Sequence, residues 1–237
     1  MHGFDVLKIV DFAARGGEPK TVVDGGFHTG SYTRKILSAW PDASIIGFEP
    51  DPEIYSAASR FALNYKNIEL LNVALGSAAG RSELFRGDMA ATNSLLPRPE
   101  SHGRPYFPSA AQLSGGVFVD VVALDDALSE RGVTRVSLLK LDLQGWELEA
   151  LKGAQKLIND ARVDVIQCEV AFVRKYQSQP LFWEICAHLA RAEYSFHSFV
   201  DVKIGPYDPE ATGPRQSQWN QADAIFVSPE VRRKMDL

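Results

Sequence analysis

Short runs of β-forming residues alternate along this chain with longer segments of helical periodicity. The alternation is typical of βαβ units, and it predicts one doubly wound α/β domain over residues 1–237 with a mostly parallel sheet of seven strands. The predicted strands are KTVVD, ASIIGFE, NIELLNVAL, VSLLKLD, VDVIQCEV, YSFHSFV and ADAIFVS. The predicted helices are HTGSYTRKILSAW, PDPEIYSAASRFALNY, GWELEALKGAQKLIND and QPLFWEICAHLARA, with an amphipathic helix over residues 4–14 inside an N-terminal segment, 1–18.

Two stretches interrupt this alternation. The residues from RSELFRG to VFVDVVA predict two extra strands, which make a small β insertion over residues 80–122 around a long loop at 97–116. A second loop is expected over residues 201–221, because both stretches are rich in Pro, Gly and Ser. Loops of this length are either functional or disordered, so each is either an acceptor-binding lid or a surface insert. Aromatic and guanidinium groups that suit polyols occur in both loops, at Arg98, His102, Arg104, Tyr106, Phe107, Arg215 and Trp219.

Composition narrows the classes of partner. A net charge of −5 and a pI of about 5.6 argue against a broad nucleic-acid-binding face. The chain has no basic leader and no apolar run near the roughly 20 residues of a membrane span, so we expect a cytoplasmic protein. Cys168 and Cys186 lack metal-ligand spacing and are expected to be small core residues. The composition gives no signal for the oligomeric state.

The segment TVVDGGFHTGSYTRK leaves an apolar strand, turns through glycines and enters a helix. Such a turn lets the backbone approach a ligand, toward which the free N–H groups of the helix point. Ser31 stands where a Walker A loop needs lysine, and Phe27 replaces the middle glycine of the dinucleotide fingerprint. A third pattern, an acid, any residue, a glycine and a second glycine four residues later, is matched by Asp24, Gly26 and Gly30 and resembles the first motif of S-adenosylmethionine-dependent methyltransferases.

The next predicted strand ends in Glu49, about 20 residues beyond the last glycine of the turn, where an acid can accept both hydroxyls of a ribose. This acid does not separate a methyl donor from NAD. An NAD(P)-dependent oxidoreductase therefore remains an alternative, as does a turn whose glycines are only structural.

Six motifs follow one another in an order and spacing that resemble the FkbM family of methyltransferases: VDGGFHTGSYT, GFEPDP, NVALGS, VVALDDAL, LLKLDLQGWELEALKGA and VIQCEV. The resemblance covers about residues 21–170. It implies a class I methyltransferase, Rossmann-like fold that carries a methyl group from S-adenosylmethionine to a hydroxyl of a saccharide or small natural product. S-adenosylhomocysteine would be the second product.

The resemblance also implies a set of site residues. The donor would be bound by Asp24, Gly26, His28, Gly30, Ser31, Tyr32, Glu49, Pro50, Ala74 and Asp142, and the reacting centre would include Asp142, Glu147 and Glu169. The chain departs from the family at two positions. Gln144 replaces an acid that relatives commonly carry, and His28 replaces a small polar residue or Asn. Because Gln144 replaces that acid, a module that binds the donor without catalysing methyl transfer is a further alternative.

Asp142 and Glu169 end two strands that we expect to be neighbours, at the edge where open α/β sheets bind ligands. Neighbouring strands lie roughly 5 Å apart, so one carboxyl would act as a proton acceptor or both would hold a divalent cation. We favour a site without a metal ion, because two carboxylates supply few of the roughly six oxygen ligands that a divalent cation prefers. Either acid could instead cap the next helix or pair with an arginine, and Glu147 lies in a first helical turn, where the helix dipole favours an acid anyway.

Overall fold

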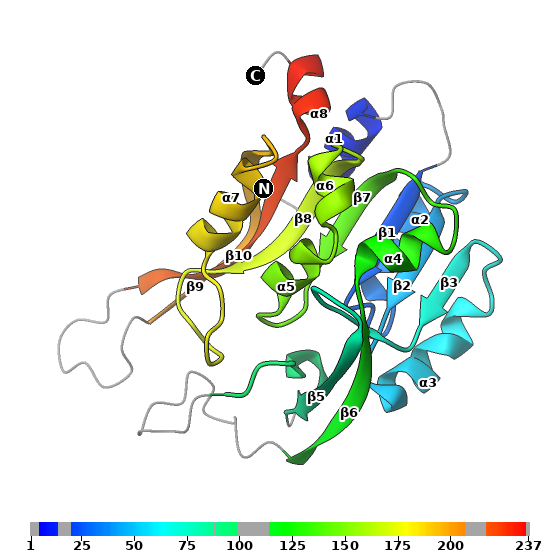
Figure 1. The fold of residues 1–237 in the computed structure, drawn as a ribbon, viewed down its shortest axis with the longest axis vertical. Coiled ribbons are helices and arrows are strands. Elements are labelled where there is room, and N and C mark those ends of the chain that lie inside the picture. Colours follow the sequence, from blue (N-terminus) through cyan, green and yellow to red (C-terminus); the bar gives the residue numbers. More distant parts are fainter. Residues whose placement is uncertain (1–4, 14–19, 88, 99–113, 207–216, 236–237) are drawn as a thin grey trace.

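The fold is a seven-stranded sheet with helices on both faces (Figure 1). The computed structural model describes residues 5–13, 20–87, 89–98, 114–206 and 217–235. The strands of the main sheet are β1 (Thr21–Gly25), β2 (Ser44–Phe48), β3 (Ile68–Leu71), β7 (Val136–Leu141), β8 (Val163–Ala171), β9 (Ser195–Pro206) and β10 (Ser217–Val227). Their order is β3-β2-β1-β7-β8-β10-β9, and only β10 runs antiparallel to its neighbours. The predicted doubly wound, mostly parallel sheet is confirmed.

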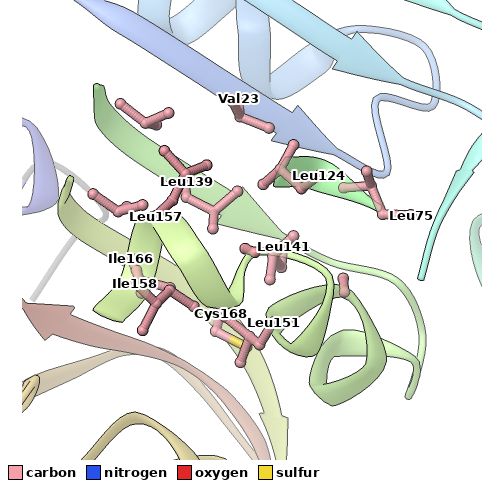
Figure 2. Close-up of a cluster of buried hydrophobic side chains, with 14 of the residues drawn as sticks. Val23, Leu75, Leu124, Leu139, Leu141, Leu151, Leu157, Ile158, Ile166 and Cys168 are labelled. Atoms are coloured by element: carbon pink, nitrogen blue, oxygen red, sulfur yellow. The ribbon is translucent and has the colours of Figure 1, made fainter. Parts of the chain in front are cut away.

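Two apolar layers bury the sheet. One layer packs α1 (Asp5–Ala13), α2 (Ser31–Ala39), α3 (Pro52–Ala62) and α8 (Pro229–Lys234). The other packs α4 (Leu124–Ser129), α5 (Glu147–Lys152), α6 (Gln155–Asn159) and α7 (Phe182–Ala190). Figure 2 shows the second layer, where Leu139 and Leu141 of β7 lie in one cluster with Leu151, Ile158 and the buried thiol of Cys168. Because the central strands are covered on both faces, they read as nearly continuous apolar runs.

A small second sheet follows β3 and lies below the main sheet in the view of Figure 1. Its strands are β4 (Ala74–Leu75), β6 (Ser114–Val122) and β5 (Gly80–Arg86), in the order β4-β6-β5, and a 3-10 turn, Ala90–Thr92, follows β5. Arg86 donates to both carboxylate oxygens of Asp51, each at 2.7 Å, and Asp51 also caps the first turn of α3. This forked contact anchors the small sheet to α3.

Several elements differ from the sequence prediction. The run NIELLNVAL splits into β3 and β4, and GWELEALKGAQKLIND splits into α5 and α6 at Gly153. A Cβ at Gly153 would lie 2.0 Å from the carbonyl oxygen of Gly76, so the chain can approach the small sheet only with glycine there. The short helices α4 and α8 were not predicted, because six residues are too few to show a helical period.

The second predicted loop is wrong at both ends. Residues 201–206 belong to β9 and residues 217–221 to β10, which pair as an antiparallel hairpin. Backbone pairing between two strands overrides the Pro and Gly composition that predicted a loop. The centres of both predicted loops, 99–113 and 207–216, lie outside the described residues, as do 1–4 and 14–19 around α1. Among the helices of the described part of the chain, none has both the length and the apolarity needed to cross a membrane.

Candidate active site

The glycine turn after β1 is held against the end of β7. Gly26 has φ +78, and a Cβ there would lie 2.0 Å from the carbonyl oxygen of Asp142. The Asp142 N–H donates to the carbonyl of Gly25 at 3.1 Å. Only glycine therefore allows the turn to lie directly beside Asp142.

A cavity of about 360 Å³ opens at this edge of the sheet, between the carboxyl ends of the strands and the small sheet. The predicted site residues that line it are Gly26, His28, Ser31, Tyr32, Glu49, Pro50, Ala74 and Asp142. The small sheet and its following turn contribute further lining, including Leu84, Asn93 and Leu95. Asp24, Gly30, Glu147 and Glu169 lie outside the lining. The structure thus brings most of the predicted donor residues around one space.

Glu49 joins the glycine turn to the end of β2. It is 5% exposed, and its two carboxylate oxygens accept from the backbone N–H of His28 at 2.8 Å and of Asp51 at 2.9 Å. Burial raises the pKa of Glu49 to about 7, although the two backbone N–H groups oppose the shift. A carboxyl that changes charge near neutral pH therefore borders the cavity.

Lys140 was not predicted as a site residue. Its ammonium lines the cavity, contacts the carbonyl oxygens of Gly25 at 3.2 Å and Gly26 at 2.9 Å, and lies 3.2 Å from an oxygen of Asp24. The other oxygen of Asp24 accepts from the Thr33 hydroxyl at 2.7 Å, and Asp24 is fully buried. Burial lowers the pKa of Lys140, but the carboxylates of Asp24 and Asp142 outweigh it, so the pKa is raised above its usual value. Asp24 thus supports the turn through Lys140 instead of facing the cavity.

A single charged residue in an apolar strand was the signal that could have identified Lys140. Two more polar residues that were not predicted also line the cavity, Gln167 in β8 and Asp223 in β10. The Tyr32 hydroxyl donates to Gln167 at 2.6 Å, and the Gln167 amide donates to Asp223 at 2.7 Å. This row extends the polar floor of the cavity from α2 to β10.

β7 and β8 are neighbours, as predicted, and they pair through Leu141 and Cys168, so Asp142, which follows β7, lies near Glu169 in β8. The side-chain amide of Gln144 donates to Asp142 Oδ1 at 2.8 Å and to Glu169 Oε2 at 3.1 Å. Glu169 also accepts from the Gln221 amide. Burial raises the pKa of Glu169 well above its usual range, and the charges of Asp142 and Glu147 add to the shift. Of the two predicted acids, Asp142 lines the cavity, whereas Glu169 lies outside the lining and contacts the side-chain amide of Gln144.

Glu147 is 2% exposed and closes the turn between β7 and α5. One of its oxygens accepts from the N–H of Leu143 at 2.7 Å and of Gly145 at 3.2 Å. Burial raises its pKa, and those N–H groups oppose the shift. These contacts order the turn, and a catalytic role for Glu147 stays a prediction. The described residues contain no group of three or more His, Cys, Asp or Glu arranged to hold a metal ion.

The strand order, the glycine turn and the acid on the neighbouring strand together define a Rossmann-like fold of the class I methyltransferase type. The family model described as "Methyltransferase FkbM domain" matches residues 24–196, and the chain belongs to this family. The family resemblance of the sequence is confirmed.

Among similar proteins, methyltransferase sdnD of Sordaria araneosa is 32% identical over 157 residues, which cover 57% of this chain and 60% of that protein. The 2-O-methyltransferase NoeI of Sinorhizobium fredii (strain NBRC 101917 / NGR234) is 29% identical over 150 residues, 60% of each. The chain therefore spans about three fifths of the length of these relatives. Among solved structures, a precorrin-6y C5,15-methyltransferase from Geobacter metallireducens GS-15 matches with a TM-score of 0.49 and 10% sequence identity. The match covers 94% of this chain and 88% of that chain.

Proposed function

We propose that this protein transfers a methyl group from S-adenosylmethionine to a hydroxyl of a saccharide or small natural product. The charge of the cavity is the observation that supports this donor most directly. Four carboxyl groups line the cavity, those of Glu49, Asp142, Asp201 and Asp223, with two lysines, Lys35 and Lys140. Lys140 already contacts Asp24 and two backbone carbonyls. The excess of carboxyl groups over lysines in the lining therefore suits a sulfonium cation better than the pyrophosphate of a dinucleotide.

The residues can be given roles on this basis. Glu49 would accept the hydroxyls of the donor ribose, and Gly26 and His28 would lie along the donor in the turn. Bound S-adenosylmethionine would supply an electrophilic methyl group on sulfur. Asp142 would take the proton that the acceptor hydroxyl loses as its oxygen gains the methyl group, which leaves a methyl ether and S-adenosylhomocysteine.

Acceptor recognition is assigned to the two flanks of the cavity. The small sheet and the turn after it supply Leu84, Asn93 and Leu95, and the β9–β10 hairpin supplies Asp201 and Asp223. The 2-O-methyltransferase activity in the name of one relative is consistent with a hydroxyl acceptor.

Ligand-dependent melting tests the donor. S-adenosylmethionine or S-adenosylhomocysteine is expected to stabilise the protein by about 2.7 kcal/mol at a hundredfold excess over the dissociation constant. NAD is expected to give no shift, because it brings two phosphates into an acid-lined cavity. A melting shift with NAD and none with either sulfur ligand would overturn the proposal. Mass spectrometry of small molecules released on denaturation gives an independent check.

Replacing Glu49 with Gln is expected to weaken donor binding, measured by calorimetry. A charged hydrogen bond is worth roughly 1.5–3 kcal/mol, so the dissociation constant should rise at least about tenfold. In the wild type, affinity should increase from pH 6 to pH 8, because ionisation of a group with a pKa of about 7 creates the charged acceptor. Glu49→Gln should bind with little pH dependence.

Glu53→Gln is the matched control for this change. Glu53 lies four residues further along the chain, and its side chain is 80% exposed. Its donor affinity should equal that of the wild type at each pH. Equal affinities for Glu49→Gln and the wild type would show that Glu49 does not contact the donor.

A further inference from the structure

Gln144 lies at the centre of the polar contacts behind the cavity. Its backbone is in the left-handed region, with φ +53, in the turn between β7 and α5. Its side-chain N–H groups donate to Asp142 Oδ1 and to Glu169 Oε2, at 2.8 and 3.1 Å. One amide therefore joins the ends of two neighbouring strands.

The side-chain oxygen of this amide faces a hydroxyl on its other side. The Tyr176 hydroxyl lies within hydrogen-bonding distance of Gln144 Oε1, at 3.1 Å, and of the Thr92 carbonyl oxygen, at 3.2 Å, and the Ser94 hydroxyl donates to the Gln144 backbone carbonyl at 2.7 Å. The opposite orientation would direct the amide oxygen at the carboxylate of Asp142, which offers it no donor when ionised. Asp142 on one side and the Tyr176 hydroxyl on the other thus favour the orientation in which the N–H groups point at Asp142 and Glu169, while Ser94 holds the backbone of Gln144.

The amide leaves one oxygen of Asp142 available. Gln144 bonds Oδ1, while Oδ2 lies 4.0 Å from the Lys140 ammonium, and the Asp142 side chain is 44% exposed. A rotation of this carboxylate would break the bond to Gln144. The geometry therefore holds Asp142 with Oδ2 free for a ligand in the cavity.

We propose that Gln144 is a positioning residue whose amide does here what a bridging cation would do. It holds the carboxyl groups of Asp142 and Glu169 side by side and orients Asp142 toward the acceptor. This role rests on the proposed methyl transfer, because it gives Asp142 its direction. The site works without a divalent cation, since amide hydrogens fill the space between the two carboxyl groups.

An acid at position 144 would reverse this arrangement. Glu has the shape of Gln but no N–H, so Gln144→Glu brings three carboxyl groups together. A carboxylate oxygen would then take the place of the amide nitrogen, 2.8 and 3.1 Å from the two facing oxygens, so that one divalent cation could be shared by oxygens of all three carboxylates after small shifts. The variant should therefore bind a divalent cation that the wild type does not bind.

The experiment measures Mn²⁺ binding by calorimetry, together with donor affinity and methyl transfer. Gln144→Glu should bind Mn²⁺, lose turnover without it and regain turnover when it is added. Gln177→Glu is the control, because it adds the same charge at an exposed position one residue from Tyr176. That control and the wild type should show neither Mn²⁺ binding nor Mn²⁺ activation, and donor affinity should be unchanged throughout.

Gln144→Met keeps the test decisive if the acidic variant does not fold without metal. Methionine has a similar length and no charge, so this variant should fold, ignore Mn²⁺ and turn over roughly 10- to 100-fold more slowly through misplacement of Asp142. Wild-type turnover in Gln144→Met, no Mn²⁺ binding or Mn²⁺-dependent melting in Gln144→Glu, or Mn²⁺ activation of the wild type would each overturn the role of Gln144. A wild type without methyl transfer would contradict the proposed function instead, and the Mn²⁺ binding comparison would still decide whether the amide stands in for a cation.

Discussion

Asp142→Asn is expected to lower methyl transfer by about 10²- to 10⁴-fold, the usual contribution of a positioned proton acceptor. The variant keeps an oxygen that can accept from Gln144, so the turn after β7 and the donor site should keep their geometry. It loses the negative charge that takes the acceptor proton. Single-turnover assays with labelled S-adenosylmethionine would measure the rate, and calorimetry would confirm an unchanged donor affinity.

Asp160→Asn provides the control, because that side chain is 56% exposed and lies in the C-terminal cap of α6, away from the cavity lining. Near-normal turnover in Asp142→Asn, with or without added Mg²⁺, would return Asp142 to a structural role. Loss of wild-type activity in EDTA and its recovery with Mg²⁺ would instead show that Asp142 and Glu169 hold a cation. That result would also contradict the role assigned to Gln144.

The main sheet could be predicted because its signals are local. Strands buried on both faces are apolar over their whole length, as in VSLLKL of β7, and the segments between them show a helical period. The glycine pattern and Glu49 also follow from neighbouring residues and a fixed offset between two strands. These features place most of the predicted donor-binding residues around the cavity without any knowledge of distant contacts.

The rest of the site depends on contacts between residues far apart in the chain. The bond from Lys140 to Gly25 spans 115 positions, and the bond from Tyr176 to Gln144 spans 32. The sequence around either residue of such a pair contains no pattern from which the other residue could be identified. The family resemblance implied that an acid is replaced at position 144, but only the structure shows an amide bonded to both remaining acids.

The extended β9–β10 hairpin escaped prediction for a related reason. Ile204 pairs with Trp219, and the strands continue beyond this pair to Pro206 and Ser217. Residues of low strand propensity are held there by the hydrogen bonds of the opposite strand, because strand preference depends on context more than helix preference does.

Lys140→Met is expected to lower the free energy of unfolding by about 3–5 kcal/mol, the usual cost of removing one partner from a buried ion pair. Asp24 is fully buried, and the only described ion-pair partner of its carboxylate is Lys140. The variant also removes the contacts to the carbonyls of Gly25 and Gly26. Urea denaturation near pH 7 would measure the loss in full, because the raised pKa of Lys140 keeps its stabilisation present up to the ordinary lysine pKa of about 10.4.

The double variant Asp24→Asn with Lys140→Met separates the ion pair from simple packing. It removes the buried charge that Lys140→Met leaves unpaired, and the asparagine amide would keep an oxygen for the Thr33 hydroxyl. The double variant should therefore regain much of the lost stability, as buried ion pairs replaced as a unit often do. If the stability losses of the single variants Asp24→Asn and Lys140→Met simply added in the double variant, the ammonium would be stabilising the turn through the carbonyls of Gly25 and Gly26 alone. Recovery would show that the loss in Lys140→Met comes from the Asp24 charge left unpaired in the interior, and not from the lost contacts to the carbonyls of Gly25 and Gly26.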